Sequence, residues 1–76
     1  MDAVKRAFSN VFTRDVRHVE PTKTGLMLGE NTRIYKEGDS YVVSFLKGTD
    51  LPTRTKIAER LDMNNVVYTL GKDFSN

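Results

Sequence analysis

Four consecutive residues, Thr53-Arg54-Thr55-Lys56, have the types and spacing that come nearest to a chemical site in this chain. They follow Pro52, which favours the first turn of a helix, so we expect them at a helix N-terminus. Backbone N–H groups, hydroxyls and cations at such an end can together hold a phosphate or a carboxylate. The alternative is a solvated turn whose charges are tolerated, because each mismatch with the helix dipole costs only about 0.3–1 kcal/mol.

A second group of basic residues falls on one face of an expected N-terminal helix. Arg6, Asn10 and Arg14 are spaced i, i+4 and i+8, and Arg17 follows closely. Such a face is ordinarily solvated, but it is also suited to phosphates or to an acidic protein surface. Arg6, Arg14 and Arg17 are therefore candidate anion or nucleic-acid contacts, together with residues 53–56.

The sequence offers no set of residues typical of catalysis or metal binding. Nucleophilic catalysis needs a nucleophile, a base and a group that orients the base, whereas the chain has one histidine, His18, and no cysteine. A structural zinc site needs four Cys or His ligands, and a nucleotide site of the common types needs a glycine-rich phosphate loop. We therefore predict a protein that is not an enzyme and that uses no metal and no cofactor.

Charge and composition further limit the functions and the cellular locations that we expect for this protein. Twelve Lys and Arg residues against ten Asp and Glu residues leave a net charge of +2, and the two signs are mixed along the chain rather than separated into blocks. A dedicated nucleic-acid binder usually concentrates its basic residues, because several phosphates must be neutralised together. The lack of cysteine, of a long apolar run and of a signal-peptide pattern favours a cytoplasmic protein that does not enter a membrane.

The elements that must position these residues begin with a helix predicted over residues 3–14. Asp2 suits its first turn and Arg14 its last, in the sense that the helix dipole favours. A single apolar stripe, expected to pack on a sheet, is formed by Val4, Ala7, Phe8, Val11 and Phe12.

Short segments bounded by glycine and proline follow this helix. Residues 24–47 alternate β-branched and aromatic residues with turns at Gly29 and Gly38, which predicts three antiparallel strands. Residues 15–20, before Pro21, are either a further strand or an extended link. A second, short helix opens at Pro52, with Ile57, Ala58 and Leu61 on its inner side.

Residues 51–72 can be interpreted in two ways, as a helix-turn-helix or as a helix followed by a strand. In a helix-turn-helix, the apolar positions that should meet Ala58 would fall on Tyr68 and Gly71, which is the wrong spacing. Residues 64–70 are rich in Asn and in β-branched residues, which favour a strand. We therefore predict a strand in which Val66, Tyr68 and Leu70 face one way, followed by a tail at residues 73–76 that frays.

These elements predict a single α+β domain over residues 1–76: helix, three to four antiparallel strands, short helix and strand, with the helices on one face of the sheet. The aromatic residues exceed what a core of this size can hide, so Tyr35, Tyr41 and Tyr68 are candidate partner contacts. We expect a non-catalytic interaction module, a small regulatory or accessory protein of phage or mobile-element type, that binds a partner protein. The alternative is a nucleic-acid-binding protein, and a symmetric homodimer is expected because a short meander leaves an open edge.

Overall fold

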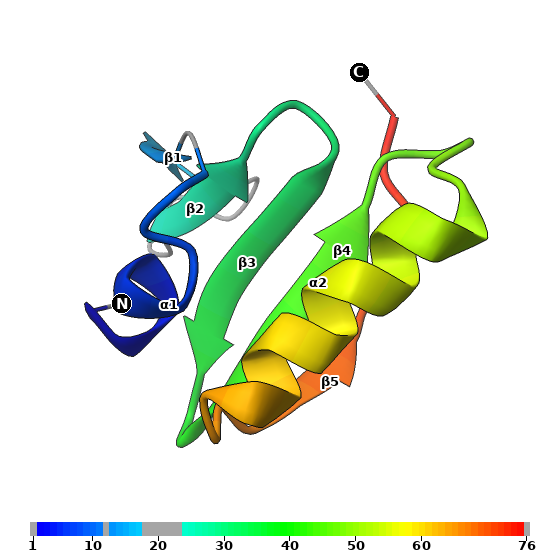
Figure 1. Ribbon diagram of the computed structural model, residues 1–76. Coiled ribbons are helices and arrows are strands. Elements are labelled where there is room, and N and C mark those ends of the chain that lie inside the picture. Colours follow the sequence, from blue (N-terminus) through cyan, green and yellow to red (C-terminus); the bar gives the residue numbers. More distant parts are fainter. Residues whose placement is uncertain (1, 12, 18–23, 76) are drawn as a thin grey trace.

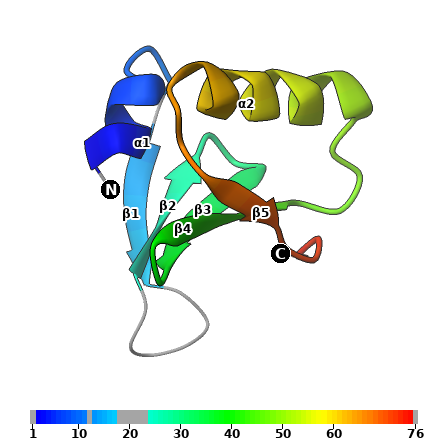
Figure 2. The same cartoon turned by 90° about the horizontal axis from the view of Figure 1, so that it is seen from below.

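The computed structural model describes residues 2–11, 13–17 and 24–75. A five-stranded sheet carries two helices on one face, so the predicted α+β class and element order are confirmed (Figures 1 and 2). In chain order the elements are α1 (Asp2–Ala7), β1 (Thr13–Arg17), β2 (Thr24–Leu28), β3 (Thr32–Glu37), β4 (Ser40–Phe45), α2 (Leu51–Met63) and β5 (Tyr68–Leu70).

The strands lie in chain order across the sheet, from β1 at one edge to β5 at the other. Strands β1 to β4 form an antiparallel meander. Gly29 and Gly38 make two of its turns with positive φ angles of 60° and 62°, a conformation that costs glycine little. Strand β5 runs parallel to β4, because the chain returns through α2 before it pairs. The predicted meander over residues 24–47 is confirmed.

The segment after α2 is a strand and not a second DNA-binding helix. Asn65 adopts a positive φ of 58°, which ends the helix, and the Val66 N–H donates to the Leu61 carbonyl at 3.0 Å. Tyr41 and Val43 of β4 then pair with Tyr68 and Leu70 of β5. The strand interpretation of this segment is therefore confirmed.

The core lies between the sheet and the two helices. Strands β2, β3 and β4 contribute alternate side chains, as expected for a sheet covered on one face. Leu61 of α2 and the following Val66 close one side, and α1 closes the other. The buried members are Val4, Ala7, Phe8, Leu26, Leu28, Ile34, Val43, Phe45, Leu61 and Val66.

The predicted helix over residues 3–14 is wrong in its length, because α1 ends at Ala7. Phe8 still reaches the core from the turn that follows, whereas Val11 is 36% exposed. Phe12 lies outside the described residues. The chain leaves the helix because residues 13–17 pair with β2 instead, and Ser9 and Asn10 are poor helix formers. The Arg60 guanidinium donates to the Ala7 carbonyl at 3.0 Å, which satisfies one acceptor at this helix end.

This early helix end also removes the predicted basic helix face. Arg14 and Arg17 belong to β1, so the spacing Arg6, Asn10, Arg14 does not produce one helical surface. Arg6 is exposed on α1. The side chains of Arg14 and Arg17, like His18 as a whole, lie outside what the structure describes.

The predicted fraying of residues 73–76 is also wrong as far as Phe74. The Phe74 N–H donates to the Phe45 carbonyl at 2.9 Å, and the Phe74 carbonyl accepts from the Lys47 N–H at 2.8 Å. The Arg33 guanidinium lies 4.1 Å from the centre of the Phe74 ring, a cation–π contact. These contacts hold Phe74, in the segment after β5, against the end of β4 and the loop that follows it.

Candidate binding groove beside strand β5

Exposed apolar side chains gather in the last part of the chain. Five large hydrophobic residues are exposed among the described ones, and one of them is Val11. The other four begin and end α2 or lie in and beside β5: Leu51 (73% exposed), Met63 (80%), Val67 (69%) and Leu70 (67%). Single exposed hydrophobic residues are ordinary on a protein surface, but Leu51 and Leu70 line one hollow, and neighbouring exposed apolar residues can mark an interaction surface.

The backbone of β5 has an open edge. The Tyr41 N–H donates to the Val67 carbonyl at 3.0 Å, and the Gly71 N–H donates to the Val43 carbonyl at 2.8 Å. Alternate residues of a strand direct their N–H and C=O groups to opposite edges, so Tyr68 and Leu70 direct theirs away from β4. Because β5 is the last strand of the sheet, no described strand pairs with these groups.

One face of α2 runs beside this edge. Leu51, Thr55, Ala58 and Asp62 are spaced i, i+4, i+7 and i+11, so they share a side of the helix. A hollow of about 260 Å³ is lined by the first three together with Leu70, and a second hollow is lined by Asp62 and β5. We call these residues the β5 groove: Leu51, Thr55, Ala58 and Asp62 of α2 with Tyr68 and Leu70 of β5.

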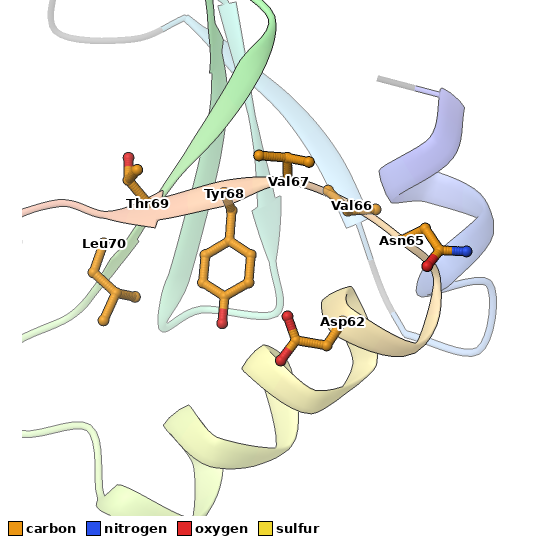
Figure 3. Close-up of a pocket in the computed structure, with 7 residues that line it drawn as sticks. All are labelled: Asp62, Asn65, Val66, Val67, Tyr68, Thr69 and Leu70. Atoms are coloured by element: carbon orange, nitrogen blue, oxygen red, sulfur yellow. The ribbon is translucent and has the colours of Figure 1, made fainter.

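The two ends of the β5 groove differ in polarity. Leu51, Ala58 and Leu70 make one end apolar. At the other end, the Tyr68 side chain points from β5 toward α2, where the Asp62 carboxylate faces the same space (Figure 3). Burial, and secondarily the charge of Asp62, raises the pKa of Tyr68, so its phenol keeps its proton. The exposed Asp62 carboxylate has no ion pair with any described cation.

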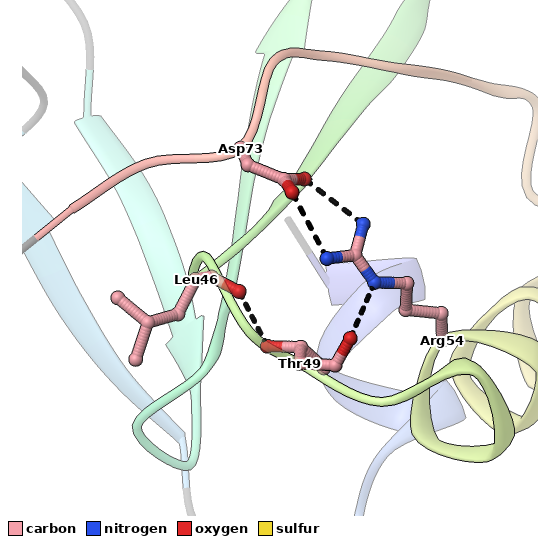
Figure 4. A network of polar contacts seen from close by, with 4 residues as sticks. All are labelled: Leu46, Thr49, Arg54 and Asp73. Carbon is pink, nitrogen blue, oxygen red and sulfur yellow. Dashed lines mark hydrogen bonds and ion pairs between the residues drawn. The ribbon is translucent and has the colours of Figure 1, made fainter.

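Arg54, beside the apolar end of the groove, is held by contacts within the chain (Figure 4). Its two terminal nitrogens donate to the two carboxylate oxygens of Asp73, each at 2.9 Å. Its Nε donates to the Thr49 carbonyl at 2.8 Å, and the Thr49 hydroxyl donates to the Leu46 carbonyl at 2.7 Å. We call Arg54, Asp73 and Thr49 the Arg54 clasp, which ties the C-terminal segment to the start of α2.

The clasp changes the ionisation of its members. The hydrogen bond from Arg54 is the main cause that lowers the pKa of Asp73, with smaller help from the charges of Arg54 and Lys47. The same hydrogen bond raises the pKa of Arg54. Both groups therefore stay charged at neutral pH, and the positive charge of Arg54 is neutralised locally.

The structure distributes the predicted anion-binding residues over two sides of α2. Arg54 and Thr55 lie beside Leu70 and Asp73, whereas Thr53 and Lys56 line a separate hollow with Phe8 and Val11. The four residues are therefore not brought to one point at the helix N-terminus. Arg6 lies on α1, which is a different element from the helix that carries residues 53–56.

The three predicted partner contacts are also separated. Tyr41 and Tyr68 are neighbours across β4 and β5, where both pack against the edge of the core. Tyr35 alternates with the buried Ile34, so it lies on the opposite face of the sheet. Only Tyr68 belongs to the β5 groove. Sequence reasoning missed Leu51, Ala58, Asp62 and Leu70 as site residues, although the helical spacing of 51, 55, 58 and 62 is visible in the chain.

Comparison with known proteins adds no relative: no family model, curated protein or solved structure matches the chain. Among the described residues, no three His, Asp or Glu side chains are grouped so that they could hold a metal ion. None of the described helices is long and apolar enough to cross a membrane.

Proposed function

We propose that this chain is a non-catalytic interaction module, a small regulatory or accessory protein that binds a partner protein through the β5 groove. The observation that carries the proposal is that the exposed Leu51 and Leu70 line one hollow beside an unpaired edge strand. An open strand edge with apolar neighbours favours aggregation of a free protein. The same edge provides a binding surface when a partner covers it.

The make-up of the groove supports this role. Leu51 and Leu70 offer apolar area whose removal from water contributes about 25 cal/mol per Å². Thr55, Asp62 and the Tyr68 hydroxyl supply polar groups around that area, which is the usual arrangement of a protein interface.

The alternative function, binding of nucleic acid through the phosphate backbone, has less support from the geometry. Arg54 is neutralised by Asp73, and Lys56 lies on another side of α2. A backbone-binding surface needs several cations that act together, because affinity arises from released counterions. Arg54 and Lys56 line different hollows of α2, and Arg6 belongs to α1.

Homodimer formation is a separate proposal about the same fold. Strand β1 ends the sheet on the side opposite β5, and an open edge of this kind can pair with its symmetry copy. Sedimentation at tens of micromolar should then show a species heavier than the 8.7 kDa chain. A single 8.7 kDa species would contradict self-association and leave the partner proposal intact.

The test of the proposed function is affinity capture from the native host with the full chain as bait. Leu70→Lys places a charge in the groove on an exposed side chain, whereas the matched control Val11→Lys changes another exposed apolar residue. We expect specific protein capture by the wild type and by Val11→Lys, and its loss with Leu70→Lys. Urea melts should show that both variants are folded.

Two results would contradict the proposal. Capture that is equal for wild type and Leu70→Lys would place the contact surface elsewhere. Recovery of nucleic acid without any specific protein would favour the alternative function.

A further inference from the structure

We propose that the β5 groove binds an extended segment of the partner protein, which joins the sheet as a sixth strand antiparallel to β5. The segment carries an aliphatic residue opposite Leu70 and, two residues later, a Lys or Arg opposite Tyr68. This inference rests on the proposed function and adds the mode of binding and the residues that are recognised.

The backbone of β5 offers the hydrogen-bonding groups that a further strand needs. Tyr68 and Leu70 direct two N–H donors and two C=O acceptors to the open side of β5, as the bonds of Val67 and Gly71 to β4 require. An added antiparallel strand would exchange pairs of hydrogen bonds with these two residues. Main-chain pairing of this kind gives affinity without requiring a particular sequence.

The direction of the side chains decides which partner residues enter the groove. Residues that stand opposite one another in an antiparallel pair project to the same face of the sheet. Tyr68 and Leu70 point toward α2, so the two partner residues opposite them also point into the space beside α2 (Figure 3). The residue between those two points away and is not selected by the groove.

The chemistry of the groove differs between the positions beside Leu70 and beside Tyr68. A partner residue opposite Leu70 meets Leu51 and Ala58, which favour an aliphatic side chain. A partner residue opposite Tyr68 meets Asp62, an exposed carboxylate without a described cation, which favours Lys or Arg. Since an antiparallel segment meets Leu70 first, the preferred order is aliphatic, any residue, basic.

The same pattern argues against a second copy of β5 as the occupant. Antiparallel pairing of two β5 strands would place Leu70 of one copy opposite Tyr68 of the other, beside Asp62. It would bring no cation to Asp62 and would put a tyrosine in the apolar end. The charge of the groove is therefore better matched by a basic segment of a different protein.

The binding experiment uses nitrogen-15-labelled full chain and an acetylated, amidated peptide, Thr-Val-Thr-Lys-Thr, followed by NMR. We expect the amide signals of Tyr68 and Leu70 to move downfield, because their N–H groups gain acceptors, while the signal of Thr69 moves less. The reversed peptide Thr-Lys-Thr-Val-Thr should bind more weakly. Peptides N-methylated at Val or Lys should lose about tenfold in affinity, and a peptide N-methylated at the central Thr should not.

Asp62→Lys supplies the matched change on the protein. Asp62 is exposed near the end of α2, where a cation agrees with the helix dipole, so the variant should fold. The wild type should prefer Thr-Val-Thr-Lys-Thr over Thr-Val-Thr-Glu-Thr by about fivefold, which is what an exposed ion pair supports. Asp62→Lys should reverse that preference.

Several outcomes would overturn the inference. The first is that millimolar peptide causes no signal changes at β5. The second is that all three N-methyl groups have equal effects on affinity. The third is that Asp62→Lys leaves the charge preference unchanged. Protection of the Tyr68 and Leu70 amides in a peptide-free dimer would assign the groove to a second copy. If partner capture depends on Leu70 while the peptides fail, strand addition is wrong and the proposed function stands.

Discussion

Arg54 has a role that its sequence neighbours do not indicate. Three of its five N–H donors are used by Asp73 and Thr49, and its guanidinium lies 5.2 Å from the centre of the Phe45 ring. A guanidinium held in this way binds an external phosphate weakly, because the phosphate would have to compete with a bidentate carboxylate contact. At the scale of single residues, Arg54 therefore organises the fold beside the β5 groove.

The Arg54 clasp predicts a dependence of stability on pH. The pKa of Asp73 is lowered from its ordinary value of 3.8, so the clasp stabilises the fold above pH 3.8 and loses this effect as the pH falls through the lower folded pKa. Asp73→Asn should lower the melting temperature modestly at neutral pH and flatten its decline below pH 3.8. Thermal melts over a pH series measure this.

Asp39→Asn is the control for that prediction, because it makes the same chemical change in an exposed turn. Its melting curve should follow the wild type across the series. An equal flattening in both variants would show that the clasp is not the source of the acid sensitivity.

Phe8 is the largest of the buried side chains that the described N-terminal segment contributes to the core. It is 2% exposed and contacts the core, whereas Val11 in the same predicted stripe is 36% exposed. Phe8→Ala should reduce the free energy of unfolding by about 3–5 kcal/mol, enough to unfold much of so small a domain. Val11→Ala should cost under about 1 kcal/mol in the same urea melts.

A small effect of Phe8→Ala would contradict the structure. It would mean that the ring is not buried in solution and that the N-terminal segment faces solvent or a partner. Far-ultraviolet circular dichroism of Phe8→Ala would separate this result from global unfolding.

At the scale of elements, β5 is held close to β4 at a point where no side chain fits. A Cβ on Gly71 would lie 2.6 Å from the Ser44 hydroxyl oxygen and 2.9 Å from a Val42 methyl carbon. Gly71→Ala should therefore destabilise the domain by about 1–3 kcal/mol, because backbone or neighbours must shift. Urea melts measure the loss.

Ser44→Ala provides the matched test, since it removes the closer of the two contacts. The double variant Ser44→Ala/Gly71→Ala should recover part of the loss, so the two changes should not be additive. Strict additivity would show that Gly71 is required for another reason, such as backbone conformation.

At the scale of the whole molecule, the distribution of charge predicts weak binding to nucleic acid. Twelve basic and ten acidic residues leave little net field, and Arg54 is already paired. Fluorescence anisotropy with duplex and single strands should show no tight binding near physiological salt. Steep salt dependence, with a slope of about −0.7 to −0.9 per phosphate, would contradict this expectation.

The double variant Arg54→Ala/Lys56→Ala tests in the same measurement whether these two cations contact phosphates. If nucleic acid is the ligand, the double variant should flatten the salt slope by about one to two units. If the partner is a protein, Leu70→Lys should instead abolish partner binding, and the basic pair should matter little for affinity.

The sequence by itself determined the elements whose signals are local. Alternation and turn glycines predicted β2 to β4, and the β-branched run after Asn65 predicted a strand in place of a recognition helix. Val4, Ala7 and Phe8 were also correctly assigned to the core. These features follow from side-chain period and backbone conformation, which act between neighbours in the chain.

Tertiary structure alone decided where α1 ends, what Arg54 does and where the groove lies. Thr13 to Arg17 leave the helical pattern because β2 offers them hydrogen bonds, and Arg54 meets Asp73 nineteen residues away. The groove exists because α2 crosses back and places β5 beside β4, so that one face of the helix stands next to an open edge. Such contacts join segments that are distant in sequence, and local propensity does not determine which distant segments will meet.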